Sequence, residues 1–84
     1  MTHTARAQAL FLSYLQPSEH PAPAQVAAAI HASLRCHGGV AGCAAALAAE
    51  YGEHPETAAA RMRWALSLAA AGMTTARTPV ALAA

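Results

Sequence analysis

Residues 47–65 read Leu47-Ala-Ala-Glu-Tyr-Gly-Glu-His-Pro-Glu-Thr-Ala-Ala-Ala-Arg-Met-Arg-Trp-Ala65, and this stretch decides the fold that the sequence predicts. Its first part predicts a helix that stops at Gly52, because glycine adopts the left-handed conformation at the lowest cost. Three residues later, Pro55 occupies the first position of a new helix, where proline is favoured. Glu56 follows in the first turn, where the helix dipole favours a carboxylate. The stretch therefore predicts two helices joined by a tight turn.

Apolar side chains repeat at helical spacing on both sides of this turn. The inward stripes that this spacing predicts are Leu47, Ala48 and Tyr51 before the turn and Ala58, Met62, Ala65, Leu66 and Ala69 after it. Small Ala48 lies four residues before Gly52, where a bulky side chain would push the two helices apart. This arrangement indicates a helix-turn-helix.

The segment Gly52-Glu-His-Pro-Glu-Thr-Ala-Ala-Ala-Arg-Met-Arg-Trp-Ala65 resembles a common pattern of bacterial DNA-binding regulators, Gly-Val-Ser-Pro-Glu-Thr-Val-x-x-Arg-Leu-x-x-Ala. Glu53 departs from that pattern, because its position is usually apolar. The layout of the whole chain is also similar to the small nucleoid-associated proteins of high-G+C Gram-positive bacteria, including a GATC-binding one. This resemblance implies a short palindromic DNA site, read at many chromosomal positions by two copies of the helix that begins at Pro55.

The rest of the chain predicts two more helices before this pair. Residues 5–15 place apolar side chains at helical spacing, with a cap at Thr2 or Thr4 and an end before Pro17. A proline-rich linker spans residues 16–22. Pro23 then starts a helix that Gly38-Gly39 terminates. The inner stripe of that helix is predicted to be Val26, Ala29, Ile30, Ser33 and Leu34.

The predicted fold is an all-α, four-helix small domain in which the third helix (about 40–51) and the fourth (about 55–71) form the helix-turn-helix. Gly72 is expected to stop the fourth helix, which gives a helical domain over residues 1–72 and a flexible tail over residues 73–84. The last three helices make the usual three-helix core. The N-terminal helix is then surplus, and it serves either as a dimerisation arm or as a cover for its own core.

Size and composition favour association with a second copy. Alanine accounts for 26 of the 84 residues, and it favours helix while adding little apolar area. A core this small gains stability from dimerisation, so a homodimer is expected. The net charge is only +1, but all four glutamates precede residue 57, whereas three of the five arginines follow it. A local basic face can bind phosphate even in a nearly neutral chain.

The outward face of the fourth helix is the candidate DNA-reading surface. The residues placed there by a turn of about 100° per residue are Glu56, Ala59, Ala60 and Arg63. Alanines allow close approach to the major groove and contact with thymine methyl groups, while the arginine suits guanine and the glutamate suits a cytosine amino group. The residues expected to contact phosphates are His54, Thr57 and Arg61 on the flanks, together with Gly39 and Arg35 at the start of the third helix.

Other classes of site find little support in the sequence. Cys36 and Cys43, with His31 and His37, match no compact zinc pattern. No catalytic constellation and no phosphate-binding loop with its lysine is present, so we expect a non-enzyme without cofactor, metal or small-molecule ligand. No run of residues approaches a membrane span, which leaves a cytoplasmic, nucleoid-bound protein as the expectation. The rival hypothesis is a helical protein–protein interaction module, such as an antitoxin-like or sigma-factor-binding adaptor.

Overall fold

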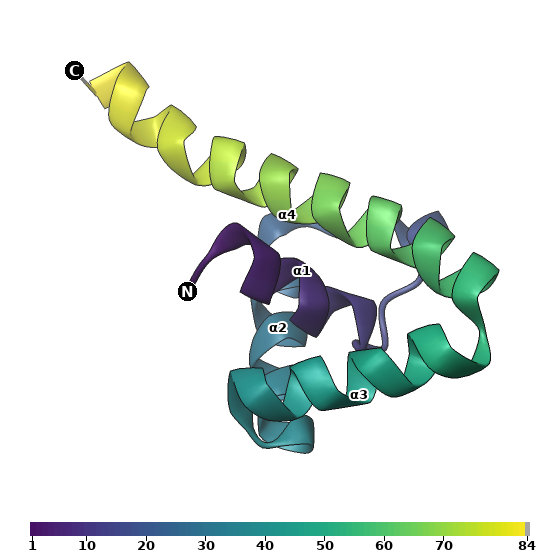
Figure 1. Cartoon of the computed structure of the whole chain (residues 1–84). Coiled ribbons are helices and arrows are strands. Elements are labelled where there is room, and N and C mark those ends of the chain that lie inside the picture. The colour runs from purple at the N-terminus through teal and green to yellow at the C-terminus, as the bar shows by residue number, and fades with distance from the viewer. Residues whose placement is uncertain (84) are drawn as a thin grey trace.

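The computed structural model describes the backbone of residues 1–83 and the side chains of residues 1–70. In this part of the chain every regular element is a helix, which confirms the predicted all-α class with four α-helices. The elements in chain order are α1 (His3–Phe11), the short 3-10 helix η1 (Pro17–Glu19), α2 (Pro23–His37), α3 (Gly39–Glu53) and α4 (Pro55–Ala83). Helices α3 and α4 diverge from their junction, and α1 lies between them (Figure 1).

Helix α1 forms the centre of the domain. It is not surplus to a three-helix core, and of its two predicted roles the packing confirms that it covers the core of its own domain. The Thr2 hydroxyl accepts a hydrogen bond from the Ala5 amide at 3.1 Å, so Thr2 is the cap. The helix makes its most extensive contacts with α4 and also packs against α2 and α3. Its buried side chains join those of the other helices in one core, which comprises Ala7, Ala9, Leu10, Phe11, Leu15, Val26, Ala29, Ile30, Cys43, Leu47, Ala58, Ala65 and Ala69.

Helix α1 is shorter than its apolar spacing suggests. It ends at Phe11, and the Ser13 hydroxyl donates to the Leu10 carbonyl oxygen at 2.6 Å. The same hydroxyl accepts from the Leu15 amide at 3.3 Å, so a local side-chain bond replaces the next helical turn. Leu15 remains buried, whereas Tyr14, which belongs to the same predicted apolar spacing, is 64% exposed.

The junction between α2 and α3 confirms the glycine signal in the sequence. Gly38 (φ 79°) and Gly39 (φ 88°) both lie in the left-handed region that favours glycine. Gly38 is the only residue between the two helices, because α3 begins at Gly39. Gly42 packs so closely against the end of α2 that a Cβ atom there would collide with the carbonyl oxygen of His37. This junction is therefore fixed by backbone contact.

The junction between α3 and α4 differs from the prediction. Gly52 does not end α3, which continues to Glu53 and leaves only His54 between the helices. The break comes from Pro55, because proline disfavours helical dihedrals at the preceding residue, and His54 adopts φ −137° and ψ 65°. Ala48 is exposed, so it does not make the close contact between helices that we expected.

Helix α4 does not stop at Gly72, since its backbone continues to Ala83. The predicted boundary at residue 72 is thus not a helix end, and the side chains of the predicted tail lie outside the described residues. On its inward face Ala58, Ala65 and Ala69 are buried as expected. Leu66, by contrast, is 37% exposed, and the half-buried residues packed against the core from this helix are Met62, Trp64 and Leu68.

Candidate nucleic-acid interface

The outward face of α4 presents the residues predicted to read bases. Glu56, Ala60 and Arg63 are exposed, and Ala59 beside them is half-buried. Ser67 is exposed as well and continues the same line at spacings of four, three and four residues, which places these side chains on one side of the helix. The opposite side of α4 packs on α1, so this face is directed away from the core.

The charges of this face are few. Arg63 has no hydrogen-bond or ion-pair partner among the described residues, so its guanidinium is free to bind a ligand. Glu56 lies in the first turn of α4, where the helix dipole stabilises its carboxylate. The described part of the face thus has one cation and one anion, with small alanine side chains between them.

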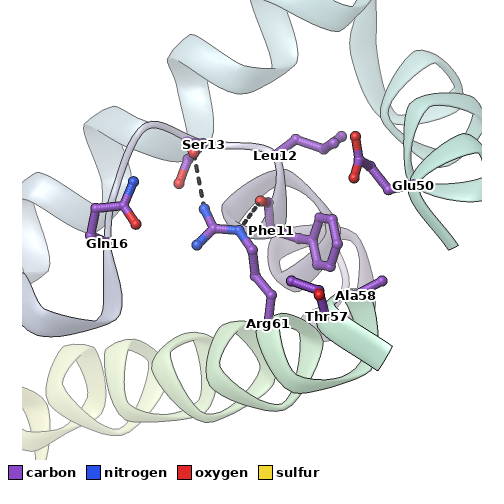
Figure 2. Close-up of a pocket in the computed structure, with 8 residues that line it drawn as sticks. All are labelled: Phe11, Leu12, Ser13, Gln16, Glu50, Thr57, Ala58 and Arg61. Carbon is purple, nitrogen blue, oxygen red and sulfur yellow. Dashed lines mark hydrogen bonds between the residues drawn. The ribbon is translucent and has the colours of Figure 1, made fainter. Parts of the chain in front are cut away.

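Arg61 lies on the other side of α4 and binds the chain's own backbone (Figure 2). Its Nε donates to the Phe11 carbonyl oxygen at 2.6 Å, and its Nη2 donates to the carbonyl oxygens of Ser13 and Leu15, each at 3.0 Å. The guanidinium carbon also lies 4.6 Å from the ring centroid of Trp64 and 5.8 Å from that of Phe11. We call this arrangement the Arg61 clamp.

The clamp corrects the predicted role of Arg61 as a phosphate ligand. Its donors are directed at the Phe11 carbonyl group, which ends α1, and at two carbonyl groups of the segment that follows. Burial lowers the pKa of the Arg61 guanidinium from its ordinary value, because the charged form loses part of its hydration. A side chain held in this way joins α4 to the end of α1 and is not available to a DNA backbone.

The other predicted phosphate contacts lie at two separate places. His54 and Thr57 are exposed at the start of α4. Exposed Arg35 and half-buried Gly39 lie at the α2–α3 junction, at the opposite end of α3, which is about 22 Å long. The structure therefore does not gather the predicted contacts into one surface. Arg35 and Gly39 belong to the α2–α3 junction, and this junction lies on the other side of α1 from α4 (Figure 1).

The Arg61 clamp could have been found from the sequence. Arg61 follows Ala58 by three residues and precedes Ala65 by four, so it shares their side of the helix. An arginine among inward-facing residues indicates either that a buried acceptor binds its guanidinium or that the inward face has been assigned to the wrong residues. The prediction instead placed Leu66 inward and Arg61 on the flank. The signal that it overlooked was the spacing of the charged residue itself.

Comparison with protein-family models, with curated proteins and with solved structures gives no match for this chain. Within the described residues, no group of three or more His, Cys, Asp or Glu side chains could hold a metal ion. The same part of the chain has no helix that combines the length and the apolar character needed to cross a membrane. Cys36 is an exposed free thiol and Cys43 a buried one, and burial raises the pKa of the Cys43 thiol.

Proposed function

We propose that this chain binds double-stranded DNA through the outward face of α4, as a nucleoid-associated protein or a compact transcriptional regulator. The observation that supports this most directly is the state of Arg63. It is exposed and without a partner in the described structure, and it lies on a face of small side chains. Arg61, two residues earlier, is held by the domain itself and fixes the helix that displays Arg63.

The chemistry of this face suits the major groove. Ala59 and Ala60 allow the helix backbone to approach the floor of the groove, and their methyl groups can contact thymine methyls. Arg63 can donate to O6 and N7 of guanine, while Glu56 can accept from the amino group of cytosine. The proposed DNA site is therefore short and contains a G·C pair with neighbouring A·T pairs.

The small charge of the face sets limits on this activity. A single copy makes few phosphate contacts, because Arg61 is engaged in its clamp and Arg35 lies far from the base-reading face. Non-specific affinity should then be low, with a log–log salt slope of about one unit per phosphate contact. Two copies on a palindromic site would double the contacts, so a homodimer is part of the proposal. Association with the nucleoid would follow from such binding.

Fluorescence anisotropy of duplexes selected from a random pool tests the proposal at about 50 mM and about 200 mM salt. Arg63→Ala should weaken binding to the preferred duplex by about tenfold or more, and it should reduce the difference in affinity between duplexes of different sequence. The matched variant Arg35→Ala, which removes the same charge elsewhere, should leave that difference unchanged. Affinity that is absent, or equal in wild type and Arg63→Ala, would contradict the assigned face.

The rival function is a helical adaptor that binds another protein. The observation in its favour is that α3 also exposes uncharged apolar side chains, including Val40. A protein-binding adaptor would show no salt-dependent affinity for any duplex, so the same titration separates the two functions.

A further inference from the structure

A cleft of about 410 Å³ lies where the end of α1, the end of α3 and the start of α4 meet. The side chains that line it and that carry the inference are Phe11, Leu12 and Gln16 from the α1 side, Glu50 from α3, and Thr57 and Arg61 from α4. Figure 2 shows Gln16 and Glu50 at opposite ends of the ring of lining residues, with Arg61 and Phe11 between them. This volume is in the range of pockets that bind small organic molecules. We call it the junction cleft.

The positive group of the junction cleft is Arg61, whose charge has no anionic partner. Its Nε and Nη2 donate to three carbonyl oxygens, but its third nitrogen, Nη1, has no hydrogen-bond partner among the described residues and is accessible to solvent. No carboxylate in this part of the chain forms an ion pair with the guanidinium. Partial burial removes some of the hydration of this cation, and a cation in that state is normally paired with an anion. Carbonyl dipoles alone leave its positive charge uncompensated.

The negative group of the junction cleft is Glu50, which is exposed in the last turn of α3. Figure 2 shows its carboxylate directed from α3 toward Leu12. This carboxylate forms no hydrogen bond or ion pair with the described residues. A ligand with only a negative charge would be attracted by Arg61 and repelled by Glu50, and a ligand with only a positive charge would meet the reverse. The pair therefore favours a ligand that has both charges.

The wall between these two charges is apolar. The Phe11 ring is stacked on Tyr51, with 6.2 Å between the ring centroids, so its position is fixed. Half-buried Leu12 continues this wall, and the exposed Thr57 lines the cleft from the start of α4. An apolar wall with a few polar groups at its ends is typical of a small-molecule site.

We propose that the junction cleft binds a small zwitterion of the amino-acid type, whose carboxylate pairs with Nη1 of Arg61 and whose ammonium group pairs with Glu50. An apolar side chain of the ligand would contact Phe11 and Leu12. Such a ligand was not expected from the sequence, because Glu50 and Arg61 belong to different helices and only the fold brings them to one cleft.

The bound zwitterion would connect α3 to α4 across their junction, in addition to the Arg61 clamp. The junction cleft lies on the clamp side of α4 and not on its outward face. The inference therefore does not rest on the proposed DNA binding, and it can be tested on the full chain without DNA.

An NMR titration of the full chain with L-leucine, up to about 50 mM, tests the ligand class. We expect saturable shifts of the Arg61 Nε–H and Thr57 amide signals, with a Kd of about 1–10 mM. Leucinol lacks the carboxylate and N-acetylleucine lacks the ammonium group, so each should bind at least about tenfold more weakly. Absence of a saturable shift with leucine, or equal affinities for the three compounds, would overturn the proposal.

The variant Glu50→Gln tests the partner of the ammonium group at an exposed position where folding is not at risk. It should weaken leucine binding by about tenfold and should not weaken the binding of N-acetylleucine. The matched control is Glu53→Gln, which removes the same charge from the end of the same helix but outside the junction cleft. It should bind leucine like wild type. Equal effects of the two variants would reject the junction cleft, whatever the result of the DNA titration.

Discussion

The two junctions of α3 look alike in chain length, but they are fixed in different ways. A single residue, Gly38, joins α2 to α3, and a single residue, His54, joins α3 to α4. At the first junction, two glycines adopt left-handed dihedrals and Gly42 contacts the backbone of α2. At the second, an added Cβ on Gly52 would meet nothing within 4 Å. The angle between α2 and α3 is therefore set at the turn itself. The angle between α3 and α4 is set away from the turn, by packing on α1 and by the Arg61 clamp.

The largest effect is expected from Gly42→Ala. The added methyl group would collide with the His37 carbonyl oxygen, so α2 and α3 would have to separate. We expect a loss of about 3 kcal/mol or more in the free energy of unfolding, at the upper end of overpacking changes. Urea denaturation followed by circular dichroism measures it. A loss below about 1 kcal/mol would show that this junction is not fixed by backbone contact.

Removal of the Arg61 clamp tests how the position of α4 beyond the α3–α4 junction is fixed. Arg61→Ala deletes three hydrogen bonds from a charged donor to the carbonyl oxygens of Phe11, Ser13 and Leu15, and with them the contact to Trp64. We expect a loss of about 2 kcal/mol in the free energy of unfolding. The matched variant Arg63→Ala, on the exposed face of the same helix, should change stability by less than about 0.5 kcal/mol. Similar losses for both variants would argue against the clamp.

The smallest effects, and opposite signs, are expected from alanine at one glycine of each junction. Gly38→Ala places a side chain at φ 79° and should destabilise the fold by about 1 kcal/mol. Gly52→Ala lies inside α3 with open space around it and should stabilise the fold by about 0.5–1 kcal/mol. Thermal melting should separate the two variants by several degrees. Destabilisation by Gly52→Ala would restore the predicted role of this glycine as a helix stop.

Much of the fold could be predicted, because its main signals act over a few residues. Pro23 and Pro55 mark helix starts, and Gly38-Gly39 marks the end of α2, since each restricts or permits backbone dihedrals at its own position. Gly52 was misread because glycine permits a left-handed turn without requiring one. Pro55 was sufficient to break the helix one residue before itself.

The candidate site was predicted less completely. Its exposed members follow from helical spacing, and Glu56, Ala60 and Arg63 are indeed on the surface of α4, although their DNA contacts remain a prediction. The position of Arg61 was wrong, because neighbouring positions on a helix differ by about 100°. A small error in the assumed inward direction is therefore enough to assign Arg61 to the flank of α4 when it faces the interior. The same error placed Leu66 in the interior, although its side chain is 37% exposed.

The sequence by itself determined four helices, the starts of α2 and α4 at proline and the sharp turn at paired glycines. Only the tertiary structure decided which side of each helix is buried and that α1 is the centre of the core. The physical reason is the abundance of alanine, which is compatible with both burial and exposure and so leaves several apolar stripes nearly equivalent. The choice among them falls to long-range contacts such as Arg61 with the end of α1, which no local pattern encodes.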